Sequence, residues 1–211
     1  MDGKFITLEG IDGSGKTTIL NKIIETLEKN GYADQLVVTR EPGGDKISEN
    51  IRNIILDNEY TEMDPRTEAL LYAASRRQHL VDIILPALKA GKIVICDRFV
   101  DSSIAYQGVG RKIGIQGIKD INNFATDYLQ PNMTLYFDVT PEISKQRVAL
   151  RERKKDRLDQ ENDDFYAKVY DGYADLVKEN PQRIKVIDAT QSVDEVFKET
   201  MAELNEFLVR E

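Results

Sequence analysis

The chain has 211 residues, 41% hydrophobic and 31% charged, with a formal net charge of −8 and one cysteine. This balance fits one globular domain, and it argues against general nucleic-acid binding, which needs a basic surface. No apolar run approaches the roughly 18 residues of a membrane span, and a lone cysteine without a signal peptide indicates a cytoplasmic protein with no intramolecular disulfide.

Short apolar strands alternate with amphipathic helices along the chain. Strands are predicted at residues 5–8, 36–39, 93–96, 133–139 and 184–187. Helices are predicted at residues 16–29, 47–56, 67–90, 115–129, 141–153, 164–178 and 192–208. We expect Pro86 to kink or divide the third helix and Gly91 to end it. The alternation predicts a parallel sheet covered on both faces, with sites at the carboxyl ends of its strands. No repeat or linker divides the chain, so residues 1–211 are expected to form a single domain.

A complete phosphate-binding loop, G-x-x-x-x-G-K-T, lies between the first strand and the first helix. Its residues are Gly10, Ile11, Asp12, Gly13, Ser14, Gly15, Lys16 and Thr17. The glycines let backbone N–H groups turn inward and form an anion site at the helix N-terminus. Lys16 can reach the β- and γ-phosphates, and the Thr17 hydroxyl can bind Mg²⁺. The motif in this setting predicts a site for a nucleoside triphosphate.

A second motif, Asp97-Arg98, follows the buried strand at residues 93–96. A carboxylate at the tip of a central strand beside the phosphate loop can hold Mg²⁺, directly or through water. Arg98 would then face the bridged phosphates. The alternative is an ordinary surface pair at a strand end, and the phosphate loop favours the functional interpretation.

The third cluster, Thr39-Arg40-Glu41-Pro42-Gly43-Gly44, closes the second strand. Pro42 and the glycines turn the chain sharply, which presents Arg40 and Glu41 at the same sheet edge as the phosphate loop. A structural turn explains the proline and glycines but not the preceding Arg and Glu, so we favour a functional cluster. Arg52, on the next helix, is a weaker candidate because most helix arginines are solvated.

Six basic residues gather within residues 147–157 of this acidic chain. A solvated basic helix end is the simpler explanation. Their concentration in a chain of net charge −8 favours contact with an anionic substrate instead. Asp12 puts a negative charge in the phosphate loop, so we expect a cation from this run to meet the transferred phosphoryl group. Arg153 is the first candidate, with Arg151 and Arg157 next.

Together these segments resemble the thymidylate kinase family of P-loop nucleoside monophosphate kinases. The resemblance rests on residues 8–18, 40–44, 70–77, 97–108 and 156–159. It implies a P-loop three-layer α/β/α sandwich with a five-stranded parallel sheet surrounded by helices, a mobile lid at about residues 147–160, and a homodimer. It also implies Mg²⁺-dependent transfer of the γ-phosphoryl group of ATP to dTMP, giving ADP and dTDP for dTTP biosynthesis.

The resemblance also implies which residues bind the acceptor. The expected dTMP-binding residues are Arg40, Glu41, Arg52, Tyr72, Arg76, Arg98, Ser103, Tyr106 and Gln107. Arg40, Arg52 and Arg98 would hold the 5′-phosphate, since guanidinium groups bind and orient a dianion. Tyr72 would stack on the pyrimidine, and Arg76, on the same helix face, would donate to its O4. Tyr106 would exclude a 2′-hydroxyl. Ser103 and Gln107 would address the base or the neighbouring sugar and phosphate.

The donor side completes the expected site. The ATP-binding set comprises residues 10–17 with Thr18, Arg151 and Arg157. The catalytic set comprises Lys16, Asp97, Arg98 and Arg153, and the metal pair is Thr17 with Asp97. Where the family often has Tyr or His, this chain has Phe99. His79, the only histidine, is expected to be an incidental helix residue.

Two other functions remain open on the sequence. A deoxynucleoside kinase would need a carboxylate base for its neutral 5′-hydroxyl, and Glu41 could supply one. A phosphorylated acceptor needs no strong base, and the surplus of arginines favours it. A nucleotide-dependent switch is disfavoured, since the N-K-x-D motif of GTPases is not present in the sequence.

Overall fold

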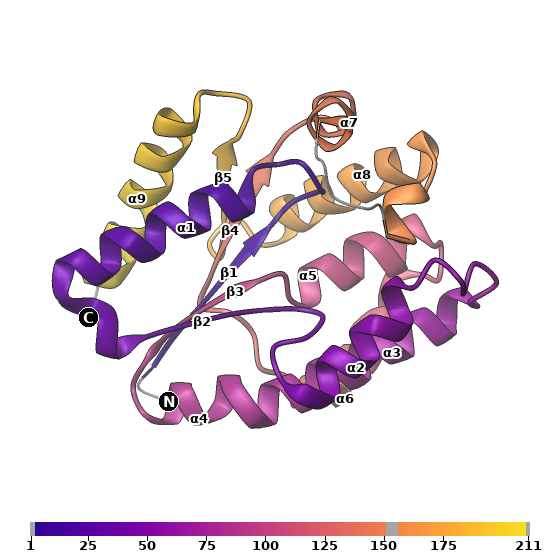
Figure 1. Cartoon of the computed structure of the whole chain (residues 1–211), viewed down its shortest axis with the longest axis horizontal. Coiled ribbons are helices and arrows are strands. Elements are labelled where there is room, and N and C mark those ends of the chain that lie inside the picture. Colours follow the sequence, from indigo (N-terminus) through magenta and orange to yellow (C-terminus); the bar gives the residue numbers. More distant parts are fainter. Residues whose placement is uncertain (1–2, 151–155, 210–211) are drawn as a thin grey trace.

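The computed structural model describes residues 3–150 and 156–209, which form a five-stranded sheet with helices on both faces (Figure 1). The strands are β1 (Lys4–Glu9), β2 (Leu36–Arg40), β3 (Ile93–Asp97), β4 (Met133–Asp138) and β5 (Ile184–Asp188). Their order across the sheet is β2-β3-β1-β4-β5, and all neighbouring strands are parallel. The predicted α/β fold class is confirmed, and all five strands lie where the sequence pattern put them.

Nine α-helices accompany the strands in the described part of the chain. They are α1 (Lys16–Leu27), α2 (Lys46–Leu56), α3 (Pro65–His79), α4 (Leu85–Lys89), α5 (Val100–Ser103), α6 (Ile115–Thr126), α7 (Pro141–Ala149), α8 (Asp163–Glu179) and α9 (Val193–Val209). Shorter helical turns occupy Glu28–Tyr32, Ala33–Gln35, Leu80–Ile84, Ile104–Gly110 and Leu158–Gln160. Among these residues no helix has the length and apolar character needed to cross a membrane.

Side chains alternate between the two faces of the sheet. Phe5 of β1 and its register partner Val94 of β3 pack with the helical segment at residues 80–89. The next pair along, Ile6 and Ile95, belongs to the larger core cluster that includes the apolar side of α1. Figure 1 shows α1 and α9 side by side on one side of the sheet and α4 on the other. Burial on both faces explains why these strands are continuously apolar.

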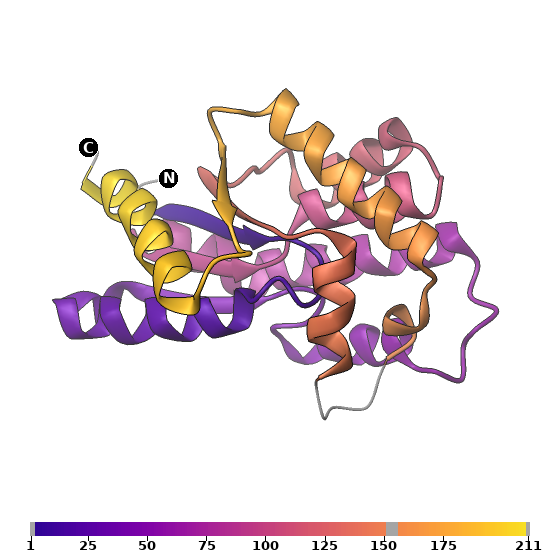
Figure 2. The same ribbon diagram turned by 90° about the horizontal axis from the view of Figure 1, so that it is seen from above.

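Three strands end at the same level of the sheet. Asp97 at the end of β3 is in register with Leu8 of β1 on one side and with Arg40 of β2 on the other. Because the strands are parallel, the segments that leave them emerge at one edge. The phosphate loop, the turn at residues 40–44 and Arg98 therefore meet at this edge. In Figure 2, α7 lies beside the loop that follows β1.

The predicted third helix is divided ahead of Pro86. A wider, π-helical turn at Leu80–Ile84 separates α3 from α4. Proline has no N–H to donate to the carbonyl four residues earlier, so the regular hydrogen-bond ladder is broken there. Gly91, with φ of 73°, follows the end of α4 as expected.

A helical segment at residues 100–110 was not predicted. It comprises α5 and the wider turn Ile104–Gly110, and nearly all of its side chains are buried. A helix buried on every side has no polar face, so the amphipathic period that reveals helices in a sequence is missing. This segment supplies four residues of the site described next: Ser102, Ser103, Tyr106 and Gln107.

Candidate active site

The phosphate loop is held open by its neighbours. Gly15, with φ of 93°, precedes α1 in a left-handed conformation. Gly13, with φ of 83°, lies so close to α7 that a Cβ there would be 2.7 Å from the Ser144 carbonyl oxygen. The Ser144 hydroxyl in turn donates to the carbonyl of Asp12. Only glycine fits at position 13, and α7 therefore supports the loop from outside.

Lys16 reaches back across the loop. Its Nζ donates to the carbonyl oxygens of Gly10 at 2.8 Å and Ile11 at 3.2 Å. The side chain is buried, and burial together with the positive charge of Arg98 lowers the pKa of Lys16 to about 8. The ammonium group is thus positioned at the mouth of an anion-binding loop.

A cavity of about 480 Å³ opens beside the loop at the carboxyl ends of β1, β2 and β3. All nine residues predicted to bind dTMP line it, and so do Asp12, Thr17, Thr18 and Asp97. The sequence analysis missed the contributions of Pro42, Leu56, Ser102, Asp156 and Leu158. Three of these are apolar side chains without a chemical signature, and only the fold shows that they face the cavity. The structure thus brings the predicted residues together, while their contacts with a ligand stay a prediction.

Two guanidinium groups converge at one wall of the cavity. Arg40 Nη1 and Arg52 Nη1 each donate to the carbonyl oxygen of Pro42 at 2.8 Å. Arg40 is also paired with Glu49 at 2.8 Å. Burial and the neighbouring Arg40 charge lower the pKa of Arg52. Two like charges held this close repel each other, and an anion bound between them would relieve that repulsion.

Arg98 occupies the centre of the cavity. Its backbone is left-handed, with φ of 72°, which is unusual for a residue with a side chain. Its guanidinium contacts Asp12 Oδ1 at 3.1 Å, Ser102 Oγ at 3.1 Å and the Tyr106 hydroxyl at 3.3 Å. Strain of this kind persists where the surroundings determine the conformation, and it gathers at functional sites.

Glu9 supports the Arg98 turn from below. Its carboxylate accepts from Phe99 N at 2.7 Å, Ser102 Oγ at 2.5 Å and the Tyr173 hydroxyl at 2.8 Å. Complete burial and the nearby charge of Asp101 raise the pKa of Glu9 to about 7. The carboxylate therefore ties the end of β1 to the start of the buried helical segment.

Asp97 and Thr17 fit the requirements of Mg²⁺. Asp97 Oδ1 is buried and has no hydrogen-bond partner among residues 3–150 and 156–209. An unpaired buried carboxylate oxygen is costly unless a ligand or ion satisfies it. The exposed Thr17 lines the same cavity, and hydroxyl and carboxylate oxygens are ligands that Mg²⁺ accepts.

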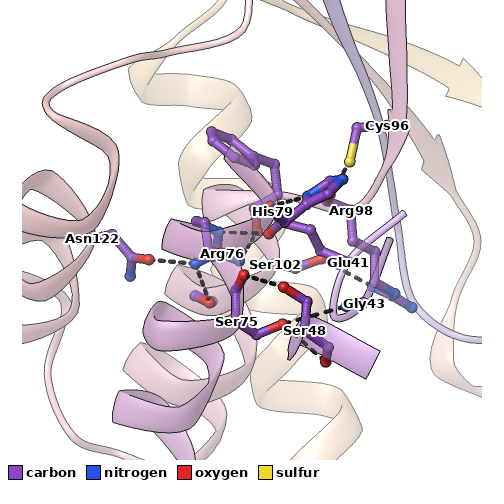
Figure 3. Close-up of polar contacts among 12 residues, drawn as sticks. Glu41, Gly43, Ser48, Ser75, Arg76, His79, Cys96, Arg98, Ser102 and Asn122 are labelled. Atoms are coloured by element: carbon purple, nitrogen blue, oxygen red, sulfur yellow. Dashed lines mark hydrogen bonds and ion pairs between the residues drawn. The ribbon is translucent and has the colours of Figure 1, made fainter. Parts of the chain in front are cut away.

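The base-recognition candidates, Tyr72 and Arg76, lie on α3. Tyr72 is half-buried, whereas Arg76 is only 2% exposed. The Nε of Arg76 donates to Glu41 Oε2 at 2.6 Å. Figure 3 shows Arg76, Glu41 and His79 joined by these contacts. Glu41 thus holds a neighbouring arginine.

The expectation that His79 is incidental was wrong. The ring is fully buried, with Nδ1 3.0 Å from Glu41 Oε1 and Nε2 2.6 Å from Thr39 Oγ1. Cys96 lies beside them, so that one ligand atom of each of Glu41, His79 and Cys96 falls within 4.8 Å of the others. Each of the three is already hydrogen bonded, the thiol to the Arg98 carbonyl. We therefore interpret the group as a hydrogen-bonded cluster.

The prediction that Arg157 contacts ATP also needs correction. Its Nη2 is 2.5 Å from Glu68 Oε2 on α3, and its Nε donates to the Ile55 carbonyl of α2 at 2.9 Å. Only 7% of Arg157 is exposed, so it anchors its segment to two helices rather than facing the phosphate loop. Arg151 and Arg153 lie outside the described residues.

A second cavity, of about 280 Å³, lies on the other side of the phosphate loop. It is bounded by Gly15 and Ile19, by Ala189 after β5, and by Arg147 of α7. Arg147 donates to the Ala189 carbonyl at 2.9 Å. The second cavity thus lies between the helix that follows the phosphate loop and the segment that follows β5.

The fold, the phosphate loop and the two cavities beside it are those expected of a P-loop nucleotide kinase. The family profile described as thymidylate kinase matches residues 8–200. The thymidylate kinase of Ligilactobacillus salivarius is 58% identical over 99% of this chain and 100% of its own length. That of Pediococcus pentosaceus is 54% identical over the same shares. The solved thymidylate kinase from Ehrlichia chaffeensis is 37% identical, covers 96% of this chain and 98% of its own, and has a TM-score of 0.78. The chain belongs to the thymidylate kinase family.

Glu68 provides a test of the ion pairs around the site. It is fully buried and bonded to Arg157, Arg111 and Gln107. Replacing Glu68 with Gln leaves the buried Arg157 without this carboxylate and Arg111 with Glu161 alone. It should lower the free energy of unfolding by about 3 kcal/mol in urea titrations at pH 7. The exposed pair Lys119–Glu179 supplies a control. Glu179→Gln should change the free energy of unfolding by less than about 1 kcal/mol.

The Glu68 effect should depend on pH. Burial favours the neutral carboxyl, but hydrogen bonds and charge from Arg111 outweigh it and hold the pKa of Glu68 below its usual 4.5. Such a group stabilises the fold above its unfolded pKa and loses the contribution as pH falls through the folded pKa. The stability difference between wild type and Glu68→Gln should therefore be constant from pH 7 to 5 and shrink below 4.5. A difference that grows on acidification would contradict this assignment.

Proposed function

We propose that this protein transfers the γ-phosphoryl group of ATP to dTMP, forming ADP and dTDP for dTTP biosynthesis. One observation carries the proposal: Arg40, Arg52 and Arg98 face a single cavity beside the phosphate loop. Full-length relatives named thymidylate kinase support the choice of acceptor.

The reaction requires positioning rather than a general base. A phosphate oxygen is already a nucleophile at neutral pH, and phosphoryl transfer passes through a loose transition state. The three arginines would orient the acceptor phosphate toward the donor. Glu41, the candidate base of a deoxynucleoside kinase, has its two oxygens on Arg76 and His79. This arrangement favours the phosphorylated acceptor.

We propose Mg²⁺ as the cofactor, with Thr17 and Asp97 as its protein ligands. The ion would neutralise charge on the β- and γ-phosphate oxygens. The unpaired Asp97 Oδ1 supports this assignment. Lys16 and residues 10–18 would bind the donor phosphates.

The chain would work as one kinase domain with a lid at about residues 147–160. Within the phosphate loop, Lys16 is the one cationic side chain and Asp12 is anionic. Asp12 also pairs with Arg98 at 3.1 Å, so the loop itself supplies little positive charge for the transferred phosphoryl group. We therefore propose Arg153, with Arg151 as the alternative, as the group that meets the transferred phosphoryl charge.

A homodimer is proposed from the surface of three adjacent helices. Large apolar side chains are exposed on α2, α3 and α6, and these helices pack side by side (Figure 1). They are Ile47 and Ile54 of α2, Leu70 of α3 and Phe124 of α6, and Tyr128 follows just after α6. A second copy of this chain would cover them.

We place the enzyme in the cytoplasm, where its substrates occur and where a free buried thiol such as Cys96 persists, and expect it to act apart from membranes and nucleic acid. Cell fractionation would test the location.

The acceptor panel tests the activity. ADP release should be fast with dTMP, slow with dUMP, dCMP and dGMP, and lower by about 10³-fold in kcat/KM with thymidine, because thymidine lacks the anion that the arginines orient. Excess chelator should abolish turnover and added Mg²⁺ should restore it. Comparable kcat/KM values for dTMP and thymidine would instead identify a nucleoside kinase.

The two catalytic cations can be tested together. Lys16→Ala should slow single-turnover phosphoryl transfer by about 10³-fold with less effect on dTMP affinity, because its charge acts on the donor phosphates. Arg153→Ala should slow it by about 10³-fold while weakening ATP binding far less. Lys145→Ala is the matched control. It removes an exposed charge of α7, which is paired with Asp163 of α8 at 2.7 Å, and its rate of phosphoryl transfer should be near that of the wild type. If neither Arg151→Ala nor Arg153→Ala slows transfer tenfold, the lid only covers the site.

The dimer can be tested on Phe124, which is 91% exposed. Phe124→Glu should convert the protein to a species of 24.0 kDa in sedimentation velocity, because a charge would be buried in the interface. Val209→Glu, at an equally exposed apolar side chain on α9, should leave the dimer intact. A wild-type protein that sediments as a monomer at every concentration would refute the dimer.

A further inference from the structure

A chain of buried polar contacts runs from β2 to the cavity wall, and the mechanism above leaves part of it without a role. Thr39 Oγ1 lies 2.6 Å from His79 Nε2. His79 Nδ1 lies 3.0 Å from Glu41 Oε1, and Glu41 Oε2 lies 2.6 Å from Arg76 Nε. Figure 3 shows the inner members of this chain between α3 and the end of β2. Its inner end, Arg76, lines the acceptor cavity.

Arg76 has almost no freedom left. A guanidinium group carries five N–H donors in a planar fork. Besides Nε, Nη1 donates to Ser103 Oγ at 3.0 Å and to Asn122 Oδ1, and Nη2 donates to the Phe99 carbonyl at 2.9 Å. Within the described residues one Nη2–H remains. The direction of that single donor depends on the orientation of the whole fork.

Among residues 3–150 and 156–209, Glu41 is the one charged group bonded to this fork, and His79 in turn holds Glu41. A carboxylate can turn about its last torsion, which has a broad energy minimum. With Oε2 on Arg76 and Oε1 on His79, the plane of the Glu41 carboxylate is set. Both side chains are at most 2% exposed, so water does not replace either contact.

The contacts of the His79 ring fix which nitrogen donates to Glu41. Nδ1–H donates to the carboxylate, and Nε2 pairs with the Thr39 hydroxyl, which can donate or accept. The other neutral tautomer would place an unprotonated nitrogen against a carboxylate. Gly44 packs so closely that a Cβ there would lie 2.5 Å from His79 Cδ2. The ring therefore cannot swing away toward the turn at residues 40–44.

We propose that His79 is a positioning residue for recognition of the pyrimidine: through Glu41 it fixes Arg76 so that the remaining Nη2–H meets a carbonyl oxygen at position 4 of the base. This inference rests on the proposed function, since it specifies how the same acceptor site reads its substrate. An amino group at position 4 would oppose donor to donor, so the arrangement selects thymine against cytosine.

The test compares dTMP with 5-methyl-dCMP, which keeps the methyl group and presents an amino group at position 4. His79→Leu removes both ring nitrogens. It should raise KM for dTMP by about 10- to 100-fold, leave KM for ATP and saturating kcat near wild type, and lower the kcat/KM preference for dTMP by the same factor. His79→Asn keeps an amide donor where the ring has Nδ1, and it should restore most of the preference.

Two further variants keep the result interpretable. Ser48→Ala removes a buried hydrogen bond to the Ser75 carbonyl, 2.8 Å long, without touching Glu41 or Arg76. It should lose stability yet keep the preference. Thr39→Val removes the outer contact and should lower the preference several-fold, and it decides the matter should His79→Leu fail to fold.

An unchanged preference in folded His79→Leu or in Thr39→Val would overturn the proposal, as would equal losses in His79→Asn and His79→Leu. Calorimetric Kd values for the two nucleotides give the same ratio without turnover. A wild-type protein that binds dTMP but does not phosphorylate it would therefore overturn the proposed function alone.

Discussion

Ion pairing between arginines and carboxylates is the interaction on which this site depends. Arg98 is held by Asp12, Arg76 by Glu41, and Arg40 by Glu49. The chain is acidic overall, yet it keeps several guanidinium groups around one cavity. Each is oriented by protein groups before any anion arrives, so binding and transfer require little reorganisation. Carboxylates of this acidic chain thus fix guanidinium groups that line the cavity.

The same pairing explains how charges are tolerated inside the fold. A buried carboxyl facing arginines keeps its charge, which is why the pKa of Glu68 is lowered despite burial. Glu9 lies equally deep but beside Asp101, and its pKa rises to about 7. These two buried carboxyls therefore differ because of their partners, since burial alone would raise the pKa of both.

The parallel sheet provides the frame for these pairs. Equal register at the ends of β1, β2 and β3 brings three loops to one edge, and the buried segment at residues 100–110 closes the cavity from behind. Arg98 stands at the junction, in a left-handed conformation supported by Glu9. The contacts of the Thr39–His79–Glu41–Arg76 chain extend this support to the cavity wall that α3 provides. Residues far from the phosphate loop thus help to fix a side chain that lines the cavity.

The sequence by itself determined the features that depend on neighbouring residues. The phosphate loop, the five apolar strands and the turn at residues 40–44 are contiguous patterns, and the strand ends that they mark indicate which side chains share an edge. Tertiary structure alone decided contacts between distant positions: Glu41 and His79 are 38 residues apart, and Glu68 and Arg157 are 89 apart. A histidine or arginine on a helix carries no local sign of its partner, because burial and pairing arise only when another element packs against it. The helical segment at residues 100–110 escaped prediction because it is buried on nearly every side. Its polar side chains, such as Asp101 and Ser102, find partners on other elements, so no solvent-facing polar stripe marks the helix in the sequence.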